Sequence, residues 1–179
     1  MSIKLKVVLG VLACLTLSAL ANARLAAWLR QQDVEAAAQQ SLHTAAESYA
    51  GLELADVEKL SAALEALAAD AGLAEAFARR DRPRLLELAT PLFTALRERH
   101  GVTHWYFHEP GPPRCFLRVH APPLHGDLVE RPTMAEAVAR QDTASGMELG
   151  RTAFALRVVR PWTRGGTLLG YLELGEEVD

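Results

Sequence analysis

The spacing of hydrophobic residues divides the chain into a helical half and a strand-rich half. From residue 30 to residue 71 there is no proline, and apolar residues recur at intervals of three or four. This is the period of an amphipathic helix, so we expect one long helix, or two helices joined near Gly51. Its second half carries an apolar stripe for which two interpretations stay open: packing against the core of the domain, and the seam of a homodimer. The stripe consists of Val57, Leu60, Leu64 and Leu67.

Two shorter helices are expected between residues 73 and 100, the first of them from Leu73 to Arg80. Asp81 is the candidate N-cap of the second, because a short polar side chain in front of a helix accepts hydrogen bonds from its free N–H groups. Pro83 falls in the first turn, where proline is tolerated. Gly101 is expected to end this helix.

Beyond Gly101 the apolar residues alternate with polar ones at a period of two, which is typical of half-buried strands. The last two runs are joined by residues 163 to 166, whose two glycines suit a hairpin turn. A long N-terminal helix, short helices and then an antiparallel sheet make an α+β fold. The expected strands cover residues 102 to 108, 114 to 120, 147 to 149, 153 to 162 and 167 to 174, with a short covering helix from 133 to 142.

The first two expected strands have one apolar and one polar face each. Trp105 and Phe107 share the apolar face of the first strand, and Leu117 and Val119 share that of the second. Solvent-facing strands usually carry Thr, Lys, Glu or Ser, whereas the polar faces of these two strands carry three histidines, a tyrosine and an arginine. The opposite faces therefore indicate a binding surface, and they carry His104, Tyr106 and His108 in the first strand and Phe116, Arg118 and His120 in the second.

The chemistry of this surface favours an anionic ligand. Arg118 offers a planar fork of donors that matches a carboxylate with two parallel hydrogen bonds. His108, His120 and the hydroxyl of Tyr106 add further donors. The alternative is that Arg118 forms a structural ion pair with Glu173 or Glu148 and that the histidines are simply solvated.

The loop after the second strand, HAPPLHGDLVERP, carries further charged candidates. Arg131 is a second anion contact. Asp127 either accepts a hydrogen bond from a ligand ammonium, orients an arginine, or caps a turn.

The last two strands add side chains that support the same surface. Arg157 and Arg160 lie on opposite faces of one strand, so at most one of them faces the pocket. Tyr171 and Glu173 share a face of the last strand, where Glu173 can neutralise one arginine. Two or three arginines against one acid predict a positive pocket in a chain whose net charge is -3.

Composition limits the function classes. With 179 residues, 50% of them hydrophobic and 23% charged, the chain suits one globular domain with an accessory segment. A net charge of -3 gives no basic field for nucleic acid, so no nucleic-acid partner is expected. Cys14 lies inside an N-terminal apolar run and Cys115 far from it, so no disulfide framework is expected.

The N-terminus predicts export. Lys4 and Lys6 precede an uncharged run from Val7 to Ala23. A basic flank before such a run keeps the lysines in the cytoplasm, so residues 1 to 29 are expected to form a single span of the inner membrane with residues 30 to 179 in the periplasm. Cleavage near Ala23, which would release a periplasmic protein, is the alternative.

The motifs HWYFHEP, FLRVHAPPLHGDL, SGMELG, LRVVRPW and GYLELGEE occur in an order that resembles the extracytoplasmic Cache-type sensor domains of bacterial chemoreceptors and sensor histidine kinases. The resemblance covers residues 30 to 179 as a single domain. It implies a PAS-like sheet between residues 102 and 175, with a small carboxylate or amino acid bound between the sheet and its covering loops. It also implies that Arg157 points into the pocket. The apolar face of the long helix, rather than the resemblance, leads us to expect a homodimer through that helix.

Catalysis, a metal and a cofactor are not expected. Ser145-Gly146 lacks the strand, nucleophile and helix context of a hydrolase. His104, His108 and His120 together would suit zinc or nickel, but an arginine in the same cluster repels a cation. A histidine-based metal sensor and a non-sensing structural or dimerisation module remain the alternatives to an anion sensor.

Overall fold

The computed structural model describes residues 3–150 and 153–178 and divides into two units, residues 1–52 and 53–179. The first unit contains the greater part of helix α1 (Ile3–Ala69), and the second contains its last turns together with all other elements. Among the residues whose placement is described, no helix is both long enough and apolar enough to cross a membrane. The predicted N-terminal span therefore stays a prediction.

Helices α2 (Ala71–Ala78) and α3 (Arg82–His100) follow α1 and begin at aspartate caps. Oδ1 of Asp70 accepts a hydrogen bond from the Leu73 N–H at 2.8 Å, and Oδ1 of Asp81 accepts one from the Arg84 N–H at 3.0 Å. Gly101, with φ of +71°, ends α3 in the left-handed conformation that glycine adopts without strain. Both ends of α3 lie where the sequence places them.

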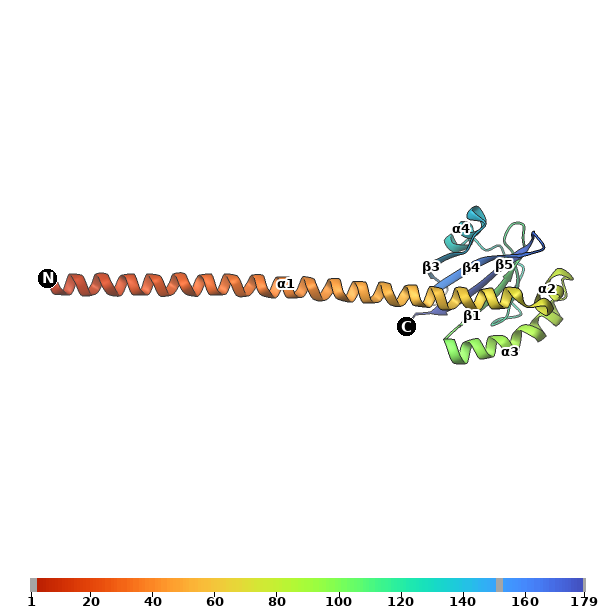
Figure 1. Cartoon of the computed structure of the whole chain (residues 1–179), viewed down its shortest axis with the longest axis horizontal. Helices are drawn as coiled ribbons and strands as arrows, with labels where there is room; N and C mark the ends of the chain where they lie inside the picture. Colours follow the sequence, from red (N-terminus) through yellow and green to blue (C-terminus); the bar gives the residue numbers. More distant parts are fainter. Residues whose placement is uncertain (1–2, 151–152, 179) are drawn as a thin grey trace. The chain divides into compact units, whose positions relative to one another are not determined.

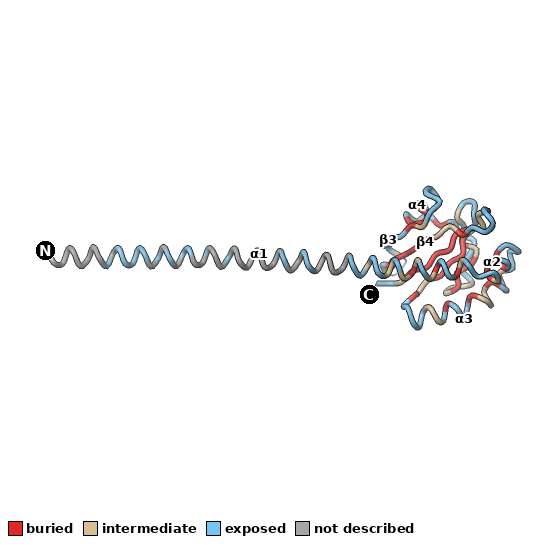
Figure 2. The backbone as a smooth tube through the Cα atoms, viewed as in Figure 1, coloured by how far each residue is buried: buried red, intermediate tan, exposed pale blue. Residues whose placement is uncertain are grey.

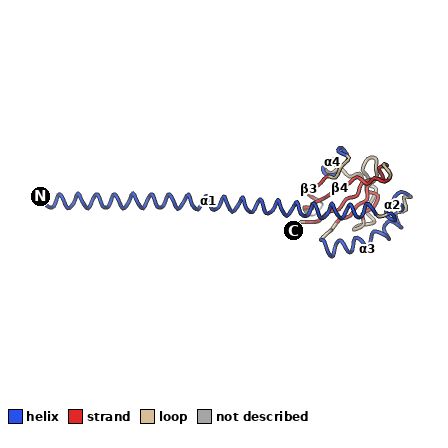
Figure 3. The backbone as a smooth tube through the Cα atoms, viewed as in Figure 1, coloured by secondary structure: helices blue, strands red, loops and turns tan. Residues whose placement is uncertain are grey.

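The sheet has five antiparallel strands in the order β2-β1-β5-β4-β3, drawn as the red segments of Figure 3. Strand β5 lies at the centre, between β1 and β4. Gly165 and Gly166 have positive φ in the β4–β5 turn, as the sequence predicts. The α+β class with a PAS-like sheet is confirmed. The strands are β1 (His104–His108), β2 (Cys115–Arg118), β3 (Ala144–Leu149), β4 (Phe154–Arg164) and β5 (Thr167–Glu177).

One face of the sheet carries the larger apolar core, which also includes α2, α3 and the last turns of α1. Figure 2 shows the buried backbone concentrated in the sheet and in the helices against it. Leu60 and Leu64 are fully buried in this core, and burying a leucine contributes about 2 kcal/mol. Core packing is therefore present for this stripe, and the dimer seam stays a prediction.

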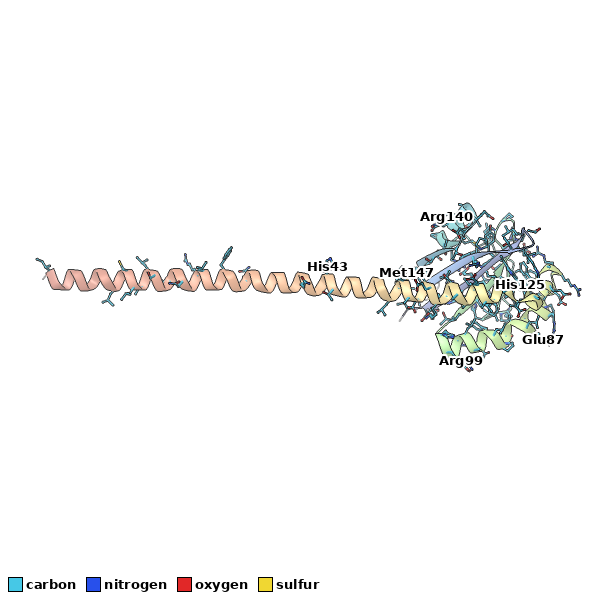
Figure 4. All side chains as sticks on the ribbon, viewed as in Figure 1. His43, Glu87, Arg99, His125, Arg140 and Met147 are labelled. Atoms are coloured by element: carbon cyan, nitrogen blue, oxygen red, sulfur yellow. The ribbon has the colours of Figure 1, made fainter. Side chains whose placement is uncertain are left out.

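The opposite face of the sheet carries a smaller core under helix α4 (Pro132–Arg140). Figure 1 shows α4 and α3 on opposite sides of the sheet, and in Figure 4 Arg140 of α4 and Arg99 of α3 lie correspondingly far apart. Tyr106, Cys115, Val159 and Tyr171 belong to this second core. The functional side chains described below lie on this α4 face.

A bulge in β2 changes one predicted side-chain direction. Tyr106 pairs with Arg118 and Phe107 with Leu117, but His108 pairs with Cys115, so Phe116 is the extra residue of a register shift. The Phe116 ring packs edge-on to Phe77 of α2, with ring centroids 5.2 Å apart. The prediction that Phe116 shares a face with Arg118 is wrong, because the bulge turns it to the helix side.

Candidate functional site

A cavity of about 730 Å³ opens on the α4 face of the sheet, a volume typical of small-molecule sites. It is bounded by β1, by the end of β2 and the loop after it, by the residue before α4, and by the β3–β4 connection. The polar lining residues are His104, Tyr106, Arg118, His120, His125, Asp127, Arg131, Arg157 and Glu177; Leu124 and Leu149 add apolar surface.

Three arginines from separate parts of the chain meet at the ring of Tyr106. The guanidinium carbons of Arg118, Arg131 and Arg157 lie 5.5, 5.0 and 5.8 Å from its centroid. Tyr106 is buried, and a cation close to the face of an aromatic ring is attracted by its quadrupole. The ring therefore acts as a common platform that keeps three positive groups within one small volume at the cavity wall.

Glu173 of β5 lies beneath this platform and is fully buried. Its carboxylate accepts hydrogen bonds from Arg131 Nη2 at 2.6 Å and from Arg157 Nη1 at 2.8 Å. His108 Nε2 lies 2.8 Å from Oε2 of the same carboxylate. Burial by itself would raise the pKa of Glu173, but the His108 hydrogen bond and the two arginine charges outweigh it and lower that pKa to about 2. Glu173 is thus ionised and holds both arginines in place.

Glu148 of β3 is a second buried acid in the same cluster. Its Oε1 accepts hydrogen bonds from the Thr133 N–H at 2.8 Å and from the Thr133 hydroxyl at 2.7 Å, at the first turn of α4. Its Oε2 lies 3.5 Å from Arg131 Nε and 3.6 Å from Arg157 Nε. The sequence analysis names Glu148 only as an alternative partner of Arg118. In the fold it connects the start of α4 to the other two arginines.

Arg118 is paired with Asp127 instead. Its Nη1 and Nη2 donate to the two carboxylate oxygens of Asp127 at 2.7 and 2.6 Å, and Nη1 also donates to the Leu124 carbonyl at 2.6 Å. The hydrogen bonds to Asp127 raise the pKa of Arg118. The alternative in which Arg118 pairs with Glu173 or Glu148 is therefore wrong. Of the roles considered for Asp127, contact with an arginine is present in the structure.

The expectation of a positive pocket also changes. It counted one acid against the arginines, whereas the folded cluster contains Glu173, Glu148 and Asp127 for three arginines. The formal charges of these six groups cancel. The predicted excess of positive charge is therefore absent among these six groups.

The predicted histidines have different positions. His104 and His120 line the cavity with their ring centroids 4.7 Å apart, and burial lowers the pKa of each to about 4. His120 Nδ1 accepts a hydrogen bond from the Trp105 N–H at 3.3 Å, so the neutral ring carries its proton on Nε2 and offers it as a donor. His108 differs, since it is fully buried beside Glu173 and does not line the cavity.

Tyr171 is also away from the cavity. It is buried under α4, and its hydroxyl accepts a hydrogen bond from Gln141 Nε2 at 2.9 Å. Arg157 lies on the cavity face of β4, as expected, while Arg160 lies on the other face, 4.0 Å from Glu65 of α1. Glu177 and the apolar residues of the cavity were not predicted, because nothing local in the sequence relates the end of β5 to the β3–β4 connection.

No part of the described chain brings together three His, Cys, Asp or Glu side chains that could hold a metal ion. Burial raises the pKa of the Cys115 thiol to about 12, which keeps it protonated and weakly nucleophilic. The polar side chains that line the cavity are mostly hydrogen-bond donors and aromatic rings.

The family model described as a double sensory domain of two-component sensor kinases, dCache_3, matches residues 35–179. Among curated proteins none matches the sequence. The chain is similar in structure to the sensor domain of DcuS from E. coli, with 16% identity, a TM-score of 0.53, and coverage of 70% of this chain and 90% of that one.

Two further solved structures share the fold. A domain of a sensory box/GGDEF family protein from Vibrio parahaemolyticus has 14% identity and a TM-score of 0.54, with coverage of 71% of this chain and 55% of that one. The extracellular domain described as that of histidine kinase vpHK1S-Z8 has 18% identity and a TM-score of 0.58, with coverage of 81% and 59%. The chain therefore spans little more than half of these two structures.

Proposed function

We propose a function for this chain from one premise: it belongs to the dCache_3 family, the double sensory domain of two-component sensor kinases. It is therefore a Cache-type sensor domain, a class that is extracytoplasmic in sensor kinases. We propose that its ligand is a small organic anion bearing at least one carboxylate, held in the cavity between β1, β2 and the loop that follows β2.

The observation that carries this proposal is the meeting of three guanidinium groups at one cavity wall, within 5.8 Å of the Tyr106 centroid. Arginine recognises carboxylates through paired, charge-assisted hydrogen bonds. Nη1 of Arg131 makes no hydrogen bond within the described residues, and the neutral ring of His120 adds an Nε2–H. These donors line a cavity of about 730 Å³, which is large enough for a small organic molecule.

The main alternative is a structural or dimerisation module without a ligand. It is less well supported, because such a module has no need of a polar cavity beside Arg118. Its candidate seam, the stripe from Val57 to Leu67, packs in the core. A homodimer through the long helix and a single N-terminal membrane span stay part of the proposal.

Strand β5 offers a route by which ligand binding changes the rest of the molecule. Glu173 lies under the cavity and Glu177 at its edge, while Glu176 between them pairs with Lys59 of α1 at 2.6 Å. A ligand that binds two arrangements of β5 with different affinity shifts their populations. We infer that α1 and the end of β5 transmit the signal.

The test is whether acetate, succinate or citrate stabilises the full chain, which is measured as a rise in Tm on thermal unfolding. A ligand at one hundred times its Kd stabilises the native state by about 2.7 kcal/mol, which raises Tm by about 5 to 10 °C for a chain of this size. Arg118→Ala should abolish the shift. Arg114→Ala is the matched control, since this neighbouring arginine binds the Gly126 carbonyl and does not line the cavity.

Stabilisation of Arg118→Ala equal to that of the unmodified chain would show that the ligand does not use this arginine. The proposed ligand class is wrong if none of the three carboxylates stabilises either the unmodified chain or Asp127→Asn, in which Arg118 has lost its charged partner.

A further inference from the structure

The three acids in the arginine cluster differ in how easily each can leave its partner. The side chain of Glu173 is 0% exposed and that of Glu148 is 7% exposed, whereas that of Asp127 is 52% exposed. Glu173 and Glu148 are also held by His108 and Thr133. Removing either acid would leave the buried Arg157 with one of its two carboxylate partners, which is unfavourable. Asp127 is thus the acid of this cluster that can exchange with a ligand.

The main chain around Asp127 is fixed independently of its side chain. The Cys115 N–H donates to the Asp127 carbonyl at 3.0 Å, and the Gly126 N–H donates to the Cys115 carbonyl at 2.7 Å. Arg114 forms an isolated bridge with Leu128 just beyond. Because these bonds tie the loop to β2, the Asp127 carboxylate can rotate away from Arg118 while its backbone stays in place.

We propose that Asp127 is an internal competitor for the ligand, with its carboxylate occupying the position on Arg118 that a ligand carboxylate takes. This inference rests on the proposed function, since it assumes that Arg118 binds the ligand. The two hydrogen bonds from Arg118 to Asp127 have the parallel, bidentate arrangement that a guanidinium forms with any carboxylate. A ligand carboxylate replaces both bonds, and Asp127 then turns into solvent.

The exchange lowers the affinity for every anion that uses Arg118. The apparent Kd equals the intrinsic Kd divided by the fraction of molecules in which Asp127 has left Arg118. For an ion pair with one half-exposed partner, molecules in which the pair is formed outnumber those in which it is open by a factor of about five. Removing the competing charge should therefore tighten binding about fivefold. The site takes a carboxylate only when the ligand's remaining contacts compensate for this competition.

The experiment compares Asp127→Asn with the unmodified full chain by calorimetric titration of acetate, succinate and citrate. Asparagine keeps the shape of the side chain and loses its charge. Glu130→Gln is the matched control, because it removes one exposed negative charge from the same loop without lining the cavity. We expect about fivefold tighter binding in Asp127→Asn and unchanged binding in Glu130→Gln. Asp127→Ser should behave like Asp127→Asn, and Arg118→Ala combined with Asp127→Asn should bind nothing.

Several results would decide the question. Binding in Asp127→Asn that equals or falls below that of the unmodified chain overturns the inference, while the proposed function stands because the unmodified chain still binds. Equal tightening in Glu130→Gln also overturns it, since general electrostatics would then explain the gain. Binding by Asp127→Asn alone supports the inference. If neither protein binds any of the three carboxylates, the inference and the proposed ligand class both fail.

Discussion

Glu173→Gln tests whether one buried carboxylate holds the arginine cluster together. The carboxylate accepts hydrogen bonds from Arg131 and Arg157 and is in contact with His108. Glu173 is inaccessible to solvent, and the side chain of Arg157 is only 3% exposed. Glutamine keeps the shape of the side chain but removes the charge. The two arginines are then left with the more distant carboxylate of Glu148, 3.5 and 3.6 Å from their Nε atoms.

The expected cost follows from this geometry. Breaking a buried ion pair from one side costs 3 to 5 kcal/mol in general, and the remaining contact with Glu148 favours the lower end, about 3 kcal/mol. For a chain of this length that loss corresponds to a fall in Tm of about 6 to 12 °C. Urea unfolding followed by far-UV circular dichroism measures the free energy of unfolding directly.

Glu176→Gln is the matched control, because it removes a carboxylate three residues away on the same strand. Its partner Lys59 is partly exposed, so we expect a loss of at most about 1 kcal/mol. If Glu173→Gln costs no more than this control, Glu173 is not the charge partner of the two arginines, and the description of the cluster beneath Tyr106 fails.

Two further predictions concern the histidines and the aromatic core. Burial lowers the pKa of His104, His108 and His120 below the ordinary value of 6.5, and for His104 and His120 it lowers the pKa to about 4. Between about pH 6.5 and pH 4 the unfolded chain therefore binds protons that the native state does not bind. The free energy of unfolding should therefore be constant above pH 6.5 and fall by a few kcal/mol as pH drops towards 4, and urea unfolding at several pH values that showed no such fall would contradict it. Phe77→Ala should lower the free energy of unfolding by about 3 to 5 kcal/mol, because Phe77 packs against Phe107, Phe116 and Trp162 in the main core. Leu92→Ala is the control in the same urea assay and should cost much less, because Leu92 is a partly exposed residue of α3.

The sequence predicts those parts of the fold that depend on local periodicity. Asp81 and Gly101 mark the ends of α3 because capping depends only on neighbouring residues. The strand order is not local, since β5 lies between β1 and β4 although it comes last in the chain. The side of Phe116 was mispredicted for a related reason: a one-residue register shift reverses a side chain and arises only when β2 pairs with β1.

The candidate site also combines features that the local sequence predicts with features that arise only in the fold. Residue type alone identifies Arg118 as a group for carboxylates, but not which carboxylate accompanies it. A buried guanidinium needs an acid, and the fold supplies acids from β3, β5 and the loop after β2. Counting charges along the sequence therefore overstates the positive charge of the cluster. What remains decisive is how firmly each acid is held. Glu173 and Glu148 are fixed by burial, so under the proposed function the selectivity for anions depends on the exposed acid paired with Arg118, Asp127, and on whether a ligand can take its place.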